Sequence, residues 1–206
     1  MEFPMRIGLY GGSFDPVHLG HLWIAESARD YLQLDEVRWI PAAKSPLKES
    51  APKASCEQRL TMLHLALSGA EGHCVDDREL RRGDVSYTVQ TLEEICAESD
   101  SDQYFFILGS DSLASMPQWF MPEKMMDLVN LAVVHRGGDP EPDYSVLEGM
   151  VDAKTIERTR ANQIIVPSIE ISSSEIRHRI MQGHSIRHRV PNAVEAYLRS
   201  EKLYLS

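Results

Sequence analysis

Short apolar runs alternate with amphipathic segments along the chain, and each predicts one element of secondary structure. Residues 5–10 are typical of a buried strand, and the pair Gly11-Gly12 after them predicts a turn. Apolar residues then recur at helical spacing over about 18–34, which predicts a helix. A second strand is expected at 36–40, so the chain begins as a strand, a helix and a strand.

The same order of elements repeats further along the chain. A loop at 41–53 precedes a helix that Ser55 and Gln58 open as a capping box and that stops near Gly69. The clearest buried strand is 104–108, which a glycine ends. Further strands are expected at 73–76, 128–135 and Ile164–Val166, and helices at 88–98 and over the whole of 172–198, with Pro191 at the start of the last element.

Elements that alternate in this way predict the fold class. The expectation is an α/β fold with a doubly wound, mostly parallel sheet, because right-handed crossovers place helices on both faces of such a sheet. We expect one domain over residues 1–206, with a helical C-terminal tail at about 172–206. The pattern assigns no element to residues 137–162.

Composition narrows the class of protein. The 206 residues are 43% hydrophobic and 25% charged, which is typical of a compact domain that needs no disulfide or metal to fold. No run approaches the about 18 apolar residues of a membrane-spanning helix, and residues 1–6 lack the pattern of a secretory signal, so we expect a cytoplasmic protein. Cys56, Cys74 and Cys96 have neither close pairing nor zinc-ligand spacing, and we expect reduced thiols.

The charge balance limits the partners. The net charge is -10, from 21 Lys and Arg against 31 Asp and Glu. This excess of negative charge disfavours broad electrostatic capture of DNA, RNA or an anionic membrane surface. An anionic ligand must therefore meet a local basic pocket.

The first candidate site is residues 11–21, where the first strand gives way to a helix. In an open parallel sheet, ligands bind beyond the carboxyl ends of the strands, and glycine amides there can approach an anion closely. His18 and His21 share one face of the helix start, beside the positive end of its dipole, and Gly20 leaves room for a flat ligand. The alternatives are a metal pair, although a helical zinc pair is usually spaced four apart, and a purely structural helix cap.

The second candidate site is residues 171–177. Ser172 followed by Glu175 is a capping box, so a helix begins near Ser173 and offers amides and hydroxyls, with Arg177 one turn further in. These donors suit a polyphosphate, because the planar guanidinium matches two oxygens at once. The alternative is an ordinary helix cap followed by a solvated basic face.

The two strings together carry a family resemblance. Residues 11–21 contain the His-x-Gly-His tetrad that follows the first strand of nucleotidylyltransferases, and residues 171–177 resemble the Ile-Ser-Ser/Ala-Thr/Ser-x-Ile-Arg string near their C-terminus. The first string is similar to the version found in bacterial nicotinate-mononucleotide adenylyltransferases. The resemblance covers most of the chain, from about Arg6 to Tyr204, and implies a Rossmann-like nucleotidylyltransferase fold.

A loop after the second strand resembles the same branch. Residues 45–48 stand where the branch often has Pro-Pro-His-Lys/Arg, and Leu47 replaces the usual His. The resemblance therefore leaves Lys48, with Lys44, to neutralise the mononucleotide phosphate. The alternative is that these lysines belong to a solvated loop.

The pyridine side of that branch is also matched. Ser86-Tyr87-Thr88 resembles its Ser-Tyr-Thr string, and Trp119 stands where the branch has an aromatic ring against the pyridine. An electron-poor ring stacks well on indole, and helix-start amides with the threonine can hold its carboxylate. Taken alone, Trp119 is more often a core residue than a ligand platform. Gln90 replaces an Asp found in many members, and His135-Arg136 either borders the adenine or ends a strand at the surface.

The resemblance implies a reaction and the residues that perform it. The phosphate of nicotinate mononucleotide would attack the α-phosphorus of ATP, giving nicotinate adenine dinucleotide and pyrophosphate in NAD biosynthesis. His18, His21 and Arg177 are the expected catalytic residues, and Mg²⁺ is expected to arrive with ATP, since the sequence shows no carboxylate cage. The mononucleotide site would consist of Lys44, Lys48, Tyr87, Thr88 and Trp119. The ATP site would consist of Gly11, Gly12, Ser13, Phe14, Gly20, Gly109, Asp111, Ser172, Ser173, Ser174 and Ile176.

Three other functions stay open from the sequence. Pantetheine-phosphate adenylyltransferase is the nearest, but its first tetrad position is usually Thr, where this chain has His18. A cytidylyltransferase is disfavoured by the matches on the pyridine side. A nucleotide-binding regulator without turnover is the alternative from a different class. The sequence predicts neither an oligomeric state nor the strength of a preference for nicotinate over nicotinamide.

Overall fold

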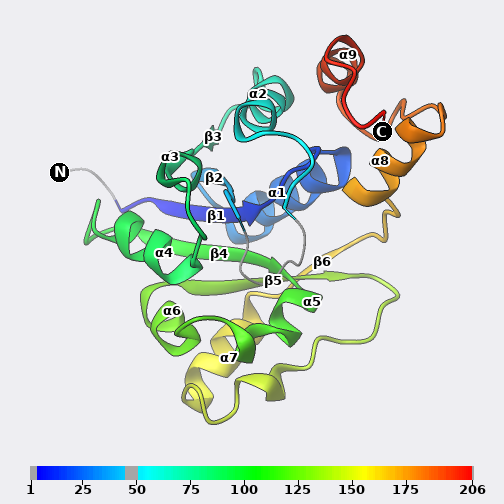
Figure 1. The fold of residues 1–206 in the computed structure, drawn as a ribbon. Coiled ribbons are helices and arrows are strands. Elements are labelled where there is room, and N and C mark those ends of the chain that lie inside the picture. Colours follow the sequence, from blue (N-terminus) through cyan, green and yellow to red (C-terminus); the bar gives the residue numbers. More distant parts are fainter. Residues whose placement is uncertain (1–3, 45–50, 206) are drawn as a thin grey trace.

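A parallel sheet forms the centre of the molecule in the computed structural model, which describes residues 4–44 and 51–205. In these residues six strands pair in the order β3-β2-β1-β4-β5-β6 (Figure 1). The central strand β4 has five consecutive buried residues, because helices cover both faces of the sheet. The predicted doubly wound sheet is confirmed. The strands are β1 Arg6–Gly12, β2 Glu36–Pro41, β3 His73–Val75, β4 Gln103–Gly109, β5 Asn130–Arg136 and β6 Ile164–Val166.

Helices form the two outer layers (Figure 1). One face of the sheet carries α1 Leu19–Leu32, α2 Cys56–Leu67, α8 Ser173–Met181 and α9 Asn192–Ser200. The other carries α4 Thr88–Cys96, α5 Ser110–Ala114, α6 Pro122–Leu128 and α7 Ala153–Ala161, with 3₁₀ helices at Met116–Gln118 and Tyr144–Leu147. The short helix α3 Arg78–Arg82 follows β3. Across the described ranges, none of the helices has the length and apolar character needed to cross a membrane.

Local sequence explains where these helices lie and start. On α1 the buried residues Ala25, Ala28 and Leu32 recur at helical spacing, and the alanines let the helix lie close to the strands. At the start of α2, the Gln58 amide donates to Ser55 Oγ at 3.1 Å and the Ser55 amide donates to Gln58 Oε1 at 2.9 Å. The capping box predicted there is confirmed.

The turn predicted at Gly11 and Gly12 is wrong. Both residues belong to β1, where they pair with Ile40 and Pro41 of β2. The left-handed backbone of this loop lies instead at Phe14, with φ 47°. Gly12 is required for space, because a Cβ at that position would lie 2.9 Å from the ring of Phe14.

The prediction that 172–198 is wholly helical is wrong for residues 182–191, whereas the predicted start of the last element at Pro191 is confirmed, since Pro191 is the N-cap of α9. The helix α8 ends at Met181, and α9 begins only at Asn192. Gly183 adopts φ 70°, and this left-handed conformation cannot continue a right-handed helix. The tail is therefore two helices joined by an irregular segment.

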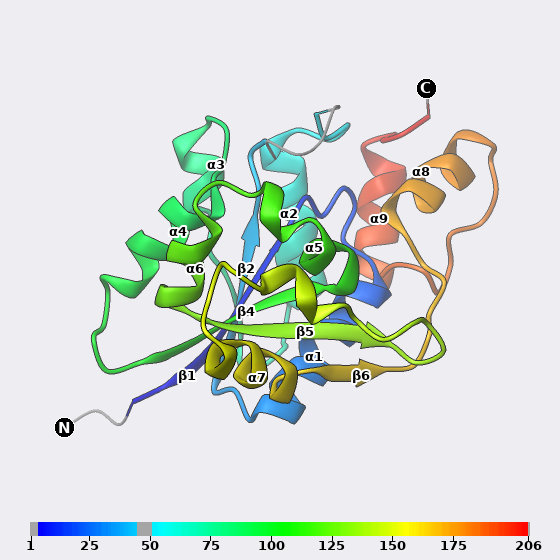
Figure 2. The same cartoon turned by 90° about the horizontal axis from the view of Figure 1, so that it is seen from below.

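The strand order creates a crevice at one edge of the sheet. Connections lead from β1 to β2 and β3 on one side and from β4 to β5 and β6 on the other, so the order reverses between β1 and β4. Ligands of such sheets bind at this reversal, beyond the carboxyl ends of the strands. Both views place α8 and α9 on the side toward which the strands point (Figure 1, Figure 2). The C-terminal motif therefore lies at the same edge as the N-terminal one.

Candidate active site

Two adjoining pockets open at the carboxyl ends of β1 and β4. The first has a volume of about 360 Å³ and the second of about 660 Å³. Gly11 and Ser112 line both, so the two pockets meet there. Of the predicted residues, the first pocket contains Gly11, His18, Gly20, His21, Gly109, Ser172 and Ser173, and the second contains Gly11, Gly12, Ser13, Tyr87, Thr88, Asp111 and Trp119.

His18 and His21 form a reciprocal cap at the start of α1. The His21 amide donates to Nδ1 of His18 at 3.3 Å, and the His18 amide donates to Nδ1 of His21 at 3.3 Å. The two rings stack, with centroids 3.7 Å apart and an angle of 18° between their planes. Because each Nδ1 accepts a hydrogen bond, each neutral ring carries its proton on Nε2. The wall of the first pocket therefore contains two imidazole N–H donors in fixed orientation.

The ring of His18 is uncharged at neutral pH. Burial, and after it the positive charge of Arg136, lower the pKa of His18 to about 4, although its backbone hydrogen bond acts in the opposite direction. Arg136 is the exposed last residue of β5 and also lines the same pocket. A neutral donor and a nearby cation can then face one anion without repelling each other.

Gly20 serves the histidine pair more directly than expected. A Cβ on Gly20 would lie 3.1 Å from both Cε1 and Nδ1 of His18. Gly20 lines the first pocket and also lies against the imidazole of His18. Gly20 therefore makes the stacked arrangement possible by leaving room for that ring.

The two sequence motifs meet in space. Ser173 Oγ donates to the carbonyl of Pro16 at 2.8 Å, and Arg177 Nη1 donates to the carbonyl of Asp15 at 2.7 Å. These bonds join residues 157 and 162 positions apart in the sequence. The guanidinium of Arg177, from α8, therefore contacts the loop that leads to His18. Arg177 does not belong to the lining of the first pocket.

Phe14 and Ile176 do not lie in the ATP pocket as predicted. They are 1% and 0% exposed and belong to the hydrophobic core. The ring of Phe14 meets His21 edge to face at 5.1 Å, so it supports the imidazole from behind. Ser174 is exposed outside the lining and accepts a hydrogen bond from Arg177 Nη2 at 3.2 Å.

Of the two predicted lysines, the structure describes Lys44, which lies at the margin of the site. Lys44 is exposed, and its carbonyl accepts a hydrogen bond from the Ser86 amide at 2.9 Å, next to the second pocket. Lys48 and Leu47 lie outside the described residues.

Trp119 forms part of the wall of the second pocket. The indole is half-buried, its Nε1 donates to Ser115 Oγ at 3.2 Å, and its ring meets Phe106 edge to face at 6.1 Å. These contacts hold the indole plane in place, which suits stacking of a flat ring. Thr88 is the first residue of α4 and Tyr87 is its N-cap, so the start of this helix lies at the same pocket.

Glu79 is a residue of the second pocket that the sequence did not reveal. It is 6% exposed and accepts a hydrogen bond from Thr91 Oγ1 at 2.7 Å. Burial raises the pKa of Glu79, which weakens its negative charge beside the pocket. It belongs to α3, whose five residues are too few to show helical periodicity. Gln90 is exposed and does not belong to this lining.

Trp23 is a second residue that the sequence analysis missed. It lines the first pocket and is 49% exposed. Its position three residues after Gly20 puts both on one face of α1, and this spacing was the available signal. A half-exposed indole offers a flat apolar surface for a base.

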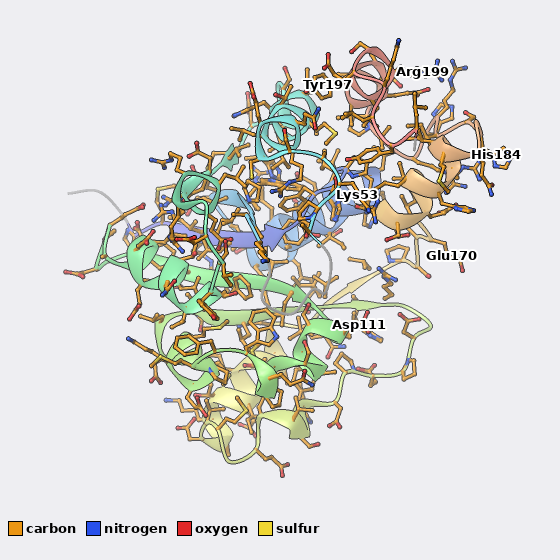
Figure 3. The ribbon with its side chains drawn as sticks, in the orientation of Figure 1. Lys53, Asp111, Glu170, His184, Tyr197 and Arg199 are labelled. Carbon is orange, nitrogen blue, oxygen red and sulfur yellow. The ribbon has the colours of Figure 1, made fainter. Side chains whose placement is uncertain are left out.

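The described residues offer no cage for a metal ion. In residues 4–44 and 51–205, no three His, Cys, Asp or Glu side chains come close enough to hold one. Asp111 is exposed on α5 and lines the second pocket (Figure 3). Cys56, Cys74 and Cys96 are free thiols.

Comparisons with known proteins agree with this arrangement. A family described as cytidylyltransferase-like matches residues 9–179. A probable nicotinate-nucleotide adenylyltransferase of Rhodopirellula baltica is 54% identical over 198 residues, covering 96% of this chain and 92% of that protein. Another, from a Synechococcus strain, is 39% identical over 200 residues and covers 97% of both chains.

A solved structure shares the fold. It is a Plasmodium falciparum nicotinic acid mononucleotide adenylyltransferase complexed with NaAD. The TM-score is 0.75 over 97% of each chain, at 20% sequence identity. At this identity the likeness shows the fold alone.

Proposed function

The chain belongs to the cytidylyltransferase-like family, and we propose that it is a nicotinate-nucleotide adenylyltransferase, which transfers AMP from ATP to nicotinate mononucleotide and releases pyrophosphate. The observation that carries the proposal is the pair of adjoining pockets. One has stacked imidazole donors and the start of α8, and the other has an indole wall and the start of α4. A triphosphate and a pyridine nucleotide are the ligands that these two sets of groups recognise.

The first pocket would hold ATP. The Nε2–H groups of His18 and His21 would donate to the α- and β-phosphates, and the start of α8 at Ser172 and Ser173 would bind the β- and γ-phosphates. Arg177 stands one turn further along α8 and would reach the same phosphates after releasing the Asp15 carbonyl. The apolar part of the pocket, with Trp23, would take the adenine.

The second pocket would hold nicotinate mononucleotide. Its pyridine would stack on Trp119, and its carboxylate would accept hydrogen bonds from the start of α4 at Thr88. Lys44, with Lys48, would neutralise the 5'-phosphate. This arrangement points the phosphate toward Gly11 and Ser112, where the two pockets meet.

The reaction needs positioning and charge stabilisation more than it needs proton transfer. The attacking phosphate is already an anion near neutral pH, so no general base and no covalent enzyme intermediate are required. Negative charge moves toward pyrophosphate as the bond to the α-phosphorus breaks. Donors fixed in advance, such as the capped imidazoles, stabilise that charge without reorganising.

We propose that Mg²⁺ enters with ATP. This ion prefers phosphate oxygens and water, with one or two protein carboxylates. The described residues of the site contain no cluster of three metal-binding side chains, so the nucleotide would supply most of the ligands of the ion. Asp111 would contact one of its waters. When bound, Mg²⁺ would neutralise charge on the phosphates.

We also propose a cytoplasmic location, since ATP and pyridine nucleotides are made and used in the cytoplasm. Cell fractionation with an antibody to the chain tests this location. Recovery from the envelope fraction would contradict it.

The function is tested by measuring pyrophosphate release with ATP and a panel of acceptors. Nicotinate mononucleotide, its amide and phosphopantetheine distinguish the proposed activity from that of the nearest related enzyme. We expect nicotinate mononucleotide to give the highest kcat/KM. Tight binding of ATP with no release from any acceptor would favour the regulator without turnover.

A further inference from the structure

A buried carboxylate joins the loop before α1 to three other parts of the chain. Asp15 is 4% exposed. Its Oδ2 accepts a hydrogen bond from the Lys53 amide at 2.7 Å, and its Oδ1 accepts one from the Ala54 amide at 3.0 Å. Tyr204 donates its hydroxyl to the same Oδ1 at 2.6 Å, and Arg177 Nη1 lies 3.7 Å from Oδ2. Lys53 stands on the segment that leads into α2 (Figure 3).

A buried cation joins the same two loops through backbone carbonyls. Arg59, on α2, is 1% exposed. Its Nη1 donates to the carbonyl of Ser13 at 2.8 Å and to the carbonyl of Ala42 at 2.7 Å. Asp15 thus accepts hydrogen bonds from amides of the segment that enters α2. Arg59 donates to the carbonyls that begin the loop after β1 and the loop after β2. The two charged side chains tie the loop after β1 to the loop after β2.

Tyr204 completes this connection from the C-terminal end. Its ring packs against the core cluster beneath α2, α8 and α9. Burial, and next the hydrogen bond to Asp15, raise the pKa of Tyr204 well above its ordinary value, so the hydroxyl keeps its proton and donates. A donor at this place satisfies a lone pair of a carboxylate that is shielded from water.

We propose that Asp15 and Tyr204 are positioning residues for the transfer reaction, which rests on the proposed function. The loop after β1 leads to the imidazoles that would bind ATP, and the loop after β2 carries Lys44, which would bind the mononucleotide phosphate. The hydrogen bonds of Asp15 set the separation of these loops, and Tyr204 fixes the carboxylate in the orientation that holds both. The two residues act through the loops and touch neither substrate.

The physical reason is the steep dependence of the transfer step on geometry. In the proposed function the imidazoles after the first loop hold ATP and Lys44 on the second loop holds the mononucleotide phosphate, so loosening the connection changes the distance between these groups more than it changes either group. The attack of one phosphate on another requires reacting atoms about 3 to 3.5 Å apart, and a misplacement of about 1 Å can cost about 100-fold in rate. A loosened connection should therefore lower kcat and leave both KM values nearly unchanged.

Tyr204→Phe is the main test, because it removes one hydroxyl and keeps the ring in the core. We expect kcat to fall about 10-fold, with both KM values within about twofold of wild type. The midpoint of thermal unfolding should stay within about 4 °C of wild type. Tyr197→Phe is the matched control, since Tyr197 on α9 packs against the same cluster (Figure 3), and its kcat should not change.

Asp15→Asn is the second variant. The amide group would place N–H donors against the donors of Lys53 and Arg177, so we expect a larger loss of kcat, about 100-fold. Hydrogen exchange of the Lys53 and Ala54 amides, measured without substrates, should be at least about 10-fold faster in both variants, because their acceptor is lost or freed to rotate.

The outcomes separate this proposal from its rivals. A Tyr204→Phe protein with wild-type kcat, or with unchanged exchange of the two amides, would overturn it. Equal increases in both KM values together with a large fall in the unfolding midpoint would overturn it in favour of a purely structural role. A wild-type protein that transfers no AMP would instead overturn the proposed function, and the positioning role with it, before any variant is compared.

Discussion

Replacing the two histidines by residues that keep the helix cap separates catalysis from folding. In His18→Asn the side-chain oxygen can still accept the His21 amide, and in His21→Gln the side-chain oxygen can still accept the His18 amide, as in an ordinary capping box. Both changes remove the imidazole Nε2–H. We therefore expect folded proteins with an intact start of α1, in which the remaining amide N–H groups do not take the place of the imidazole Nε2–H.

The magnitude follows from what each variant loses. One preorganised donor to a developing negative charge contributes about 2 to 4 kcal/mol, so kcat/KM should fall by about 30- to 1000-fold. His18→Ala would lose the cap as well, at a cost of about 1 kcal/mol of stability. In a chain of this size that cost lowers the unfolding midpoint by about 2 to 4 °C. His18→Asn should keep the midpoint and lose the activity.

Steady-state release of pyrophosphate and thermal unfolding followed by circular dichroism make the comparison. His64→Asn on the exposed face of α2 is the matched control, and it should change neither quantity. Asparagine and glutamine variants that keep kcat/KM within about threefold of wild type, with unchanged midpoints, would show that the imidazoles stabilise no charge in the reaction.

Three further predictions follow from the same geometry. The folded pKa of His18, about 4, lies below its ordinary value of 6.5, so the unfolded chain takes up a proton as the pH falls between these values. The free energy of unfolding is therefore highest above pH 6.5 and falls by about 3 kcal/mol toward pH 4 because of this group. Urea titrations at several pH values should show a smaller fall in His18→Asn. Gly20→Ala should push the His18 ring aside and lower kcat/KM at least about 10-fold, and an unchanged value would contradict the contact at 3.1 Å. ATP should quench the fluorescence of Trp23 and nicotinate mononucleotide that of Trp119, so Trp23→Phe and Trp119→Phe should each abolish one signal, while the buried Trp39 responds to neither.

The sequence predicted the sheet and the meeting of the two motifs because both depend on strong, local patterns. Residues 104–108 are apolar without interruption, since their strand is covered on both faces. The strings around His18 and Ser172 combine helix-capping chemistry with the end of a parallel strand, so their place at the sheet edge follows from the fold class.

Other features depend on contacts between distant residues and leave no periodic signal. Phe14 looks like part of a loop motif, but tertiary packing places its ring in the core behind His21. The role of Asp15 depends on amides 38 and 39 positions away and on a hydroxyl 189 positions away. Helices of five residues, such as α3 with Glu79, are too short for apolar spacing to reveal.

The most direct test is a crystal structure of the protein with nicotinate mononucleotide and an ATP analogue whose α–β bridge cannot be cleaved. We expect Nε2 of His18 and His21 within hydrogen-bond distance of the α- or β-phosphate, the amides of α8 on the outer phosphates, and the mononucleotide phosphate facing the α-phosphorus. A triphosphate bound away from the two imidazoles, or a pyridine ring outside the pocket of Trp119, would contradict it.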